Sequence, residues 1–250
     1  MDLSVSEKER YDRQMRISGW GEEGQRKLKQ SKVVVMGMGG LGCPASIYLA
    51  AAGVGNLVLV DKESSELSNL NRQILHWQKD LGRPKVLSAK EKIEELNSEI
   101  NVEAIKTEIN EKNIGELASG ATVILDAMDN FKVRFLINRV CVEKAIPFVH
   151  AGIYGFQGQM TTIVPGKGPC LRCIFPQSPP EAERFPVAGV TPGVLGVLQA
   201  MEVIKLIVGL GEPLIGKILF FDGEDMTFIT CEVPRNPDCT ICKKVGLTKT

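Results

Sequence analysis

The chain has 250 residues, enough for one large domain with a substantial core. Its 30 Lys and Arg residues balance 30 Asp and Glu residues, which excludes a global field that attracts nucleic acid or a membrane surface. The N-terminal stretch MDLSVSEKERYDRQ has no apolar segment of the signal-peptide type, so we expect a cytoplasmic protein that binds neither nucleic acid nor membrane.

Residues 1–30 are polar with scattered apolar positions, which indicates an N-terminal helical segment. The stretch KVVVMG then predicts a buried parallel strand, and GLGCPASIYLAAAG predicts a helix of small residues. NLVLVD predicts a second strand that ends at Asp61. Together they form the strand–helix–strand unit of a nucleotide-binding fold.

The alternation of strands and helices continues to about residue 152. GRPKVLSAKEKIEELN has Pro84 near a predicted helix start, and FKVRFLINRVCVEKA reads as another helix. NVEAIKTEI, ATVILDAMDN and IPFVHAGI read as strands. Residues 31–152 are therefore expected to form a Rossmann-like, doubly wound, mostly parallel α/β sheet that binds a nucleotide.

The pattern changes in residues 153–250, although we expect one continuous domain. GFQGQMTTIVP, GKILFFD and MTFITCEVP are extended runs, predicted to add antiparallel strands to the sheet. The Pro-rich stretch FPQSPPEAERFP predicts a mobile loop over residues 176–190. Residues 194–210 are apolar but interrupted by Gln199, Glu202 and Lys205, which favours a packed amphipathic helix over a membrane span.

A glycine loop follows the first predicted strand. Gly37, Gly39 and Gly42 match the pattern G-x-G-x-x-G, which lets backbone N–H groups and a helix N-terminus approach phosphate oxygens. Asp61 is placed to accept hydrogen bonds from ribose hydroxyls. NAD and ATP both satisfy this arrangement.

Polar and cationic residues after Asp61 favour ATP. The stretch SELSNLNRQILH contains Asn69, Asn71, Arg72 and Gln73, and Lys85 follows at a helix start. Substitution at the α-phosphorus of ATP builds charge on the departing pyrophosphate, which two cations would neutralise. Either cation alone reads as a solvated surface charge; the pair downstream of the glycine loop favours ATP.

Two aspartates lie at the end of the strand in LDAMDN. Asp126 and Asp129 are candidate contacts to Mg²⁺ or ribose, because ligands of open α/β sheets bind at the strand ends. A helix N-cap is an equally supported role for Asp126. Asp129 directly precedes the next helix and is the better functional candidate.

Four of the seven cysteines form two C-x-x-C pairs. Four thiolates in paired knuckles predict a tetrahedral structural Zn²⁺ site that tethers the C-terminus to the middle of the chain. Cys43, Cys141 and Cys231 lie in apolar elements and are expected to be buried, while His76 and His150 have no partner evident from the sequence. The predicted metal ligands are Cys170, Cys173, Cys239 and Cys242.

The order of these motifs resembles the MoeB/ThiF (HesA) family, relatives of ubiquitin-activating enzymes. The resemblance runs from ERYDRQMR through GMGGLGCP, LSNLNRQILH, GRPK, DAMDNFKVRFLIN, PCLRC and GVLGVLQAMEVIK to PDCTIC. It implies an adenylyltransferase: the C-terminal Gly-Gly carboxylate of a ubiquitin-like sulfur carrier attacks the α-phosphate of ATP, giving an acyl adenylate and pyrophosphate. An external sulfur donor then acts on the adenylate.

The resemblance also assigns roles to residues. It implies that Asp61 binds ribose, that Asp129 acts through Mg²⁺ beside Asn130, and that Arg13 reaches the nucleotide of the other subunit of a homodimer. Residues 153–250 would supply carrier-binding strands. The residues that would line the phosphates are Gly40, Ser68, Asn69, Leu70, Asn71, Arg72, Gln73 and Lys85.

One departure concerns the loop before AGV. Sulfur-transferring relatives carry a cysteine there, whereas this chain has Phe185 followed by Pro186, so no enzyme thioester is expected. A nicotinamide-dependent oxidoreductase and a non-catalytic scaffold stay open as alternatives. The pathway also stays open: molybdopterin synthesis, thiamine synthesis, tRNA thiolation or another sulfur pathway.

Overall fold

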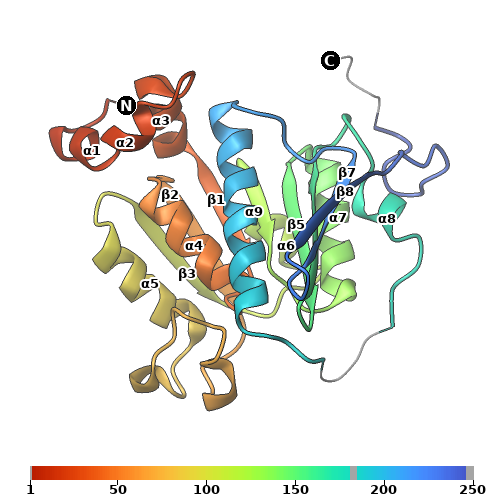
Figure 1. Ribbon diagram of the computed structural model, residues 1–250, viewed down its shortest axis with the longest axis horizontal. Helices are drawn as coiled ribbons and strands as arrows, with labels where there is room; N and C mark the ends of the chain where they lie inside the picture. The colour runs from red at the N-terminus through yellow and green to blue at the C-terminus, as the bar shows by residue number, and fades with distance from the viewer. Residues whose placement is uncertain (1, 181–184, 246–250) are drawn as a thin grey trace.

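A single eight-stranded sheet runs through the protein in the computed structural model, which describes residues 2–180 and 185–245 (Figure 1). Its strand order is β3-β2-β1-β4-β5-β6-β7-β8. The strands are β1 (Lys32–Met36), β2 (Asn56–Asp61), β3 (Asn101–Lys106), β4 (Val123–Asp126), β5 (Phe148–Tyr154), β6 (Gln157–Ile163), β7 (Lys217–Asp222) and β8 (Thr227–Glu232).

Helices cover both faces of this sheet. The α-helices are α1 (Val5–Arg10), α2 (Asp12–Met15), α3 (Gly21–Gln30), α4 (Gly42–Ala51), α5 (Lys85–Leu96), α6 (Ile114–Leu117), α7 (Phe131–Lys144), α8 (Leu171–Ile174) and α9 (Val190–Val208). Two 3₁₀ turns, η1 (Leu67–Asn69) and η2 (Gln78–Asp80), lie between β2 and α5. All the strands and long helices predicted from the sequence are present.

The first five strands in space, β3 to β5, are parallel, and β6 to β8 extend them in antiparallel fashion. The predicted fold class is therefore confirmed. The chain passes outward from β1 to β2 and β3 and then crosses back to β4, so the strand order reverses between β1 and β4. Ligands of such sheets bind at this reversal, beyond the carboxyl ends of the strands.

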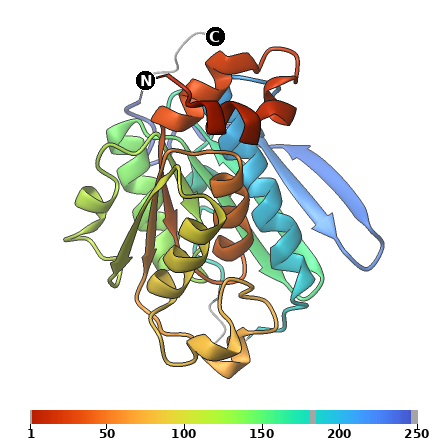
Figure 2. The same cartoon turned by 90° about the vertical axis from the view of Figure 1, so that its left-hand side faces the viewer.

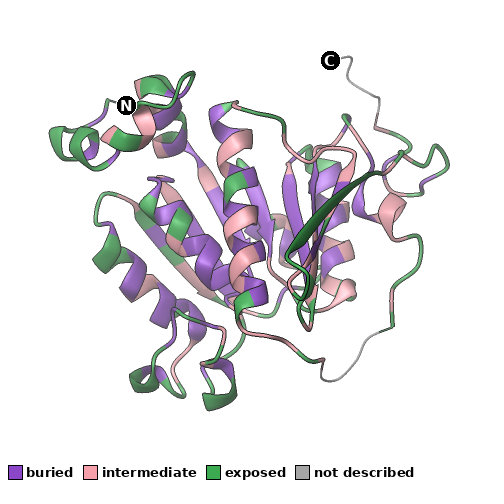
Figure 3. Ribbon diagram, viewed as in Figure 1, coloured by how far each residue is buried: buried purple, intermediate pink, exposed green. Residues whose placement is uncertain are grey.

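Burial on both faces explains why the central strands are continuous apolar runs. Val33 and Val35 of β1 pack with α4, α5 and α9 in one core cluster, whereas Val34 and Met36 pack with α6, α7 and α8 in the other. Successive side chains of a strand point to opposite faces, so both sets must be apolar. Figure 3 shows the buried central strands between the two helical layers.

Helix α9 is the one helix among residues 2–180 and 185–245 that is long and apolar enough to cross a membrane. It instead packs on β4, β5 and β6, with Gln199 and Glu202 buried. The Gln199 amide donates to the carbonyls of Asp126 and Val149, at 2.8 and 3.1 Å. The prediction of a packed amphipathic helix is confirmed.

The β7–β8 hairpin projects from the body of the protein (Figure 2). Every residue of β8 is exposed, including Cys231. The prediction that Cys231 is buried is wrong, because β8 is the edge strand and no helix of the described chain covers it. An apolar run alone does not reveal whether a strand lies at an edge.

Part of the predicted mobile loop is anchored, while residues 181–184 lie outside the described residues. Gly155, in the turn between β5 and β6, donates its N–H to the Pro186 carbonyl at 2.7 Å and accepts from the Ala188 N–H at 3.1 Å. The Thr191 hydroxyl also donates to the Gly155 carbonyl, at 3.0 Å. The C-terminal part of the loop is thereby tied to the sheet at the start of α9.

A buried ion pair fixes η2 to α5. The ammonium of Lys92 lies 2.6 Å from a carboxylate oxygen of Asp80, and both side chains are at least 95% buried. Burial opposes ionisation of Asp80, but Lys92 and the N–H of Trp77 outweigh it and lower the Asp80 pKa to about 2. The pair therefore holds the segment between β2 and α5 in place.

Replacing Asp80 by Asn should lower the free energy of unfolding by about 3 kcal/mol at pH 7, because Lys92 is left buried without a counter-charge. Asp80 has a pKa below its ordinary value of 3.8, so its stabilisation is present above that pH and disappears as the pH falls toward about 2. The difference in the free energy of unfolding between wild type and Asp80→Asn, measured by urea titration, should disappear over this pH range. Glu94→Gln, which breaks an exposed pair with Lys90, should cost at most about 0.5 kcal/mol; an equal cost for both variants would contradict the assignment.

Candidate nucleotide site and four-cysteine cluster

A cavity of about 440 Å³ lies beyond the carboxyl ends of the parallel strands. It is next to the glycine loop, at the position where the strand order reverses. Its lining residues come from the segment after β2 and from the turn after β4: Glu63, Ser64, Glu66, Asn69, Arg72, Gln73 and Asp129. Four of them are predicted site residues, and three acidic or hydroxyl residues were not foreseen.

The glycine loop has the tight geometry that its sequence predicts. Gly37 has a φ of +102°, and a β-carbon there would lie 2.6 Å from the Ala127 carbonyl oxygen. A β-carbon on Gly42 would lie 1.9 Å from the Gly37 carbonyl oxygen. Both positions therefore require glycine.

The N–H groups of Gly39 and Gly40 donate to no group within the described parts of the chain. Gly39 borders the cavity, because a β-carbon on it would approach the Gln73 amide at 3.7 Å. Donors of this kind at the start of a helix are suited to phosphate oxygens. The loop thus has unused donors next to Gln73 of the cavity lining, although none of the predicted glycines itself lines the cavity.

Asp61 lies at the end of β2 and helps to shape the loop. One carboxylate oxygen accepts from the Met38 N–H and the other from the Glu63 N–H, both at 2.7 Å. Each carboxylate oxygen has a further lone pair. The side chain is therefore fixed beside the glycine loop and still able to accept from a ribose hydroxyl.

Asn69, Arg72 and Gln73 line the cavity on the side of the segment that follows β2. Asn69 is buried and accepts from the Glu66 N–H at 3.0 Å, which fixes the 3₁₀ turn. The Arg72 guanidinium donates to the Ser68 carbonyl and to the Asn71 side chain, at 3.0 and 2.9 Å. Ser68 lies in η1 and Leu70 and Asn71 follow it directly, but these three predicted residues do not line the cavity.

Lys85 lies directly behind the cavity. Its side chain is 98% buried, and its ammonium is 2.5 Å from the Glu63 carboxylate, which lines the cavity. A solvated surface charge is therefore the wrong interpretation of Lys85. The missed residue Glu63 follows the strand end by two positions, and that placement is the signal that would have identified it.

Asp129 lines the cavity from the other side. Asn130 caps α7 by accepting from the Val133 N–H at 3.0 Å, and its amide donates to Asp129 at 3.2 Å. Asn130 is thus the helix cap and a support for Asp129.

Asp126 neither faces a ligand nor caps a helix: it is buried, and the N-cap of α7 is Asn130. Its carboxylate is fully buried beneath the cavity, where it accepts from His150 Nδ1–H at 2.7 Å and from the Met128 N–H at 3.0 Å. Burial lowers the pKa of His150, so the ring is neutral and donates to Asp126. Asp126 therefore holds the turn that carries Asp129.

The remaining buried side chains also have structural partners. His76 contacts the Met38 carbonyl at 2.9 Å and the Ser88 hydroxyl at 3.1 Å. Burial raises the pKa of the Cys43 thiol to about 12 and also raises that of Cys141. Core packing is therefore the correct interpretation of both cysteines.

Arg13 lies away from this cavity. It is exposed on α2, among the helices beside the amino end of β1, whereas the cavity is at the carboxyl ends of the strands (Figures 1 and 2). The structure therefore does not bring Arg13 to the site of its own chain.

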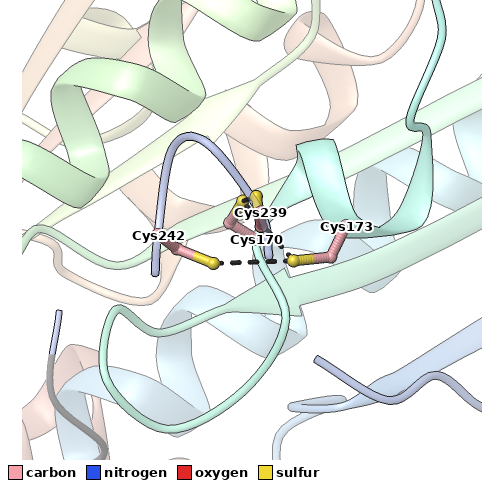
Figure 4. Close-up of side chains that lie close together, drawn as sticks. All are labelled: Cys170, Cys173, Cys239 and Cys242. Atoms are coloured by element: carbon pink, nitrogen blue, oxygen red, sulfur yellow. Dashed lines mark hydrogen bonds between the residues drawn. The ribbon is translucent and has the colours of Figure 1, made fainter. Parts of the chain in front are cut away.

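Four cysteine sulfurs form a compact cluster between α8 and the C-terminal segment (Figure 4). The sulfur of Cys170 lies 3.9 Å from that of Cys173 and 3.6 Å from that of Cys239, and Cys173 lies 3.5 Å from Cys242. All four atoms lie within 4.8 Å of one another. A tetrahedral Zn²⁺ with Zn–S bonds of about 2.3 Å requires sulfurs about 3.8 Å apart, so the cluster fits such an ion.

Known proteins are similar to this chain over almost its whole length. The ThiF family model matches residues 11–241. The SAMP-activating enzyme E1 of Haloferax volcanii is 45% identical over 252 residues, covering 99% of this chain and 93% of that protein. The sulfur carrier protein adenylyltransferase of Thermus thermophilus is 40% identical, covering 97% of this chain and 93% of that protein.

Solved structures show the same fold. E. coli MccB in a crystal structure with ATP has a TM-score of 0.84 and 30% identity, covering 94% of this chain and 75% of that chain. The family resemblance noted from the motifs is confirmed, and the predicted adenylyltransferase class is the class stated in the relatives' names. The chain belongs to the ThiF family.

Proposed function

We propose that this protein adenylates the C-terminal Gly-Gly carboxylate of a small ubiquitin-like sulfur carrier, using ATP and Mg²⁺. The observation that carries the proposal is the cavity lined by Arg72, Gln73 and Asp129, with Lys85 directly behind Glu63. The Gly39 N–H, unused within the described chain, lies next to Gln73 of this lining. The names of the archaeal and Thermus relatives support the same substrate class.

The chemistry needs alignment and charge neutralisation more than proton transfer. A C-terminal carboxylate has a pKa of about 3.3–3.7, so it is ionised and nucleophilic at neutral pH. Arg72 and Lys85 would offset charge on the departing pyrophosphate, while the N–H groups of Gly39 and Gly40 would hold phosphate oxygens. Asp61 would fix the ribose and so direct the α-phosphate toward the carrier.

Carboxylates beside the cavity suit Mg²⁺. Asp129 and Glu66 are exposed there, and this ion is usually held by one or two carboxylates together with substrate phosphates. Without the ion, the acidic side chains that line the cavity would repel the triphosphate of ATP. The ion would neutralise part of this phosphate charge. Asp129 is the residue that we propose to hold it.

Nucleotide selectivity tests this assignment against the oxidoreductase alternative. ATP with Mg²⁺ should bind in a calorimetric titration, and NAD should bind far more weakly. Tighter binding of NAD would contradict the proposal. The relatives named as adenylyltransferases do not favour the oxidoreductase.

We further propose that the four-cysteine cluster holds one structural Zn²⁺. All four coordination positions would be filled by Cys170, Cys173, Cys239 and Cys242, which leaves none for a substrate or water. The ion would tether the C-terminal segment to α8.

A cytoplasmic location of the protein stays a prediction.

A homodimer with shared active sites is part of the proposal. Arg13 is exposed and remote from its own cavity, so it can serve an ATP site only in a partner subunit. Large apolar side chains are about half exposed on α4, on α9 and in the segment before α5, as expected of a surface that a second copy covers. They are Tyr48, Met201, Ile74 and Trp77.

Mixing Arg13→Ala chains with Asp129→Ala chains should restore activity. Only a mixed dimer contains one site with both Asp129 and the partner's arginine, so random re-assortment restores about a quarter of all sites. The measurement is pyrophosphate exchange before and after subunit mixing. Activity that stays absent in verified mixed dimers would contradict the shared site.

The carrier is proposed to bind the antiparallel strands. Phe220, Phe228 and Ile229 on β7 and β8 are 42–59% exposed and offer an apolar surface for a folded partner. The hairpin projects freely from the body (Figure 2). The sulfur pathway that the carrier serves stays open, and the sulfur donor is proposed to be a separate molecule.

No carrier thioester should form on the enzyme. The family resemblance implies that Phe185 stands where sulfur-transferring members carry a cysteine. Cys43 and Cys141 are buried, and Cys231 lies on the outer strand β8. Mass spectrometry after reaction with ATP and carrier should find no thiol-labile conjugate. A conjugate on any of these three cysteines would refute this prediction but leave adenylation unaffected.

A further inference from the structure

One buried histidine contacts each of the three segments that surround the proposed ATP site. His76 is 97% buried, and its Nε2 lies 2.9 Å from the Met38 carbonyl in the glycine loop. Its Nδ1 lies 3.1 Å from the hydroxyl of Ser88, one turn after Lys85 on α5. Its backbone N–H donates to the carbonyl of Gln73, which lines the cavity.

These partners determine which ring nitrogen carries the proton. A carbonyl oxygen only accepts, so Nε2 must carry the hydrogen donated to Met38. Nδ1 then accepts from the Ser88 hydroxyl. The Ser88 oxygen in turn accepts from the Lys92 ammonium at 3.0 Å, and Lys92 is paired with Asp80. The ring is thereby held in one orientation and one tautomer.

The contact with Met38 also orients the next peptide group. The Met38 N–H is donated to Asp61 at 2.7 Å and its carbonyl accepts from His76, so both ends of this residue are fixed. In a trans peptide the C=O and the following N–H point in opposite directions. The carbonyl points toward His76, so the Gly39 N–H points away from it and stays unbonded within the described chain.

We propose that His76 is a positioning residue for the nucleotide: it locks the glycine loop to the Asn69–Gln73 stretch and to α5, and so aims the Gly39 N–H at a phosphate. This inference rests on the proposed ATP site, and it assigns no contact between His76 and substrate. The role follows from geometry that no single motif contains, since Met38, His76 and Ser88 are far apart in sequence.

Two substitutions test the role of His76. His76→Leu removes both ring contacts and leaves the Met38 carbonyl with only the weak Cys43 thiol donor, at 3.4 Å. We therefore expect the dissociation constant and the KM for ATP to rise about tenfold, with a smaller change in kcat. His76→Gln retains an N–H donor and should recover part of the affinity. Ile114→Ala, a cavity variant on the opposite face of the sheet, controls for lost stability and should leave ATP affinity unchanged.

Nuclear magnetic resonance gives a readout without nucleotide. The His76 ¹⁵N shifts of the wild type should show a neutral ring protonated on Nε2, and the Gly39 amide signal should move in His76→Leu but not in Ile114→Ala. An unchanged Gly39 signal together with unchanged ATP affinity would overturn the inference. A shifted Gly39 signal in a protein whose wild type does not bind ATP would support the effect of His76 on the glycine loop, but it would refute the proposed function and with it the role toward the nucleotide.

Discussion

Replacing Arg72 or Lys85 by Ala should lower the rate of ATP–pyrophosphate exchange by about 10²–10³, the usual loss for one charge-stabilising contact in a transition state. Arg72 lines the cavity, and Lys85 lies behind it against Glu63. Both cations are proposed to act on charge that appears only as pyrophosphate departs. The loss should therefore appear in kcat as well as in kcat/KM.

Lys90→Ala is the matched control. Lys90 lies on α5 as Lys85 does, but it is partly exposed and pairs with Glu94 on the surface. Its replacement should leave the exchange rate within a factor of about two. Lys85→Ala also leaves Glu63 without its partner, so thermal unfolding should be recorded for each variant. If Arg72→Ala and Lys85→Ala retained the rate of Lys90→Ala, the assignment of both cations would be wrong.

If the four-cysteine cluster holds the proposed Zn²⁺, loss of one ligand should release the metal and destabilise the C-terminal half of the chain. Protein purified without added metal should contain about one zinc per chain, and Cys239→Ser should contain little or none. Cys239 is buried within the cluster that ties the C-terminal segment to α8. Since folding and metal binding are coupled in structural sites, we expect the free energy of unfolding to fall by several kcal/mol.

Cys231→Ser provides the control for this experiment. Cys231 is exposed on β8 and is not part of the cluster, so its replacement should change neither zinc content nor stability. Elemental analysis and chelator-induced unfolding measure the two effects. Wild-type protein that contains no zinc and is insensitive to a chelator would contradict the structural zinc site.

The sheet was predictable because its signals are local. β2 was predicted with its final residue at Asp61, since a buried parallel strand is one continuous apolar run with a polar end. The four-cysteine site was predictable for the same reason, because each C-x-x-C pair places two metal ligands close together in the sequence. Their meeting across 69 residues in the structure agrees with the prediction from that spacing.

The errors arose where the decisive partner is distant in sequence. Asp126 has the position of a ligand-binding aspartate, but His150 on the neighbouring strand β5 buries and occupies its carboxylate. Cys231 lies in an extended run with Phe228 and Ile229, but β8 has only one neighbouring strand and no covering helix among the described elements. The partners of His76 are likewise set by tertiary packing alone.

The most direct test of the central claim is isotope exchange between pyrophosphate and ATP in the presence of purified carrier candidates. We predict exchange with a small protein that ends in Gly-Gly, dependent on Mg²⁺, and none with the same protein lacking its final glycine. The assay should cover every small protein with this terminus from the source proteome. Exchange that proceeds equally without carrier, or that no such carrier supports although ATP binds, would contradict the account.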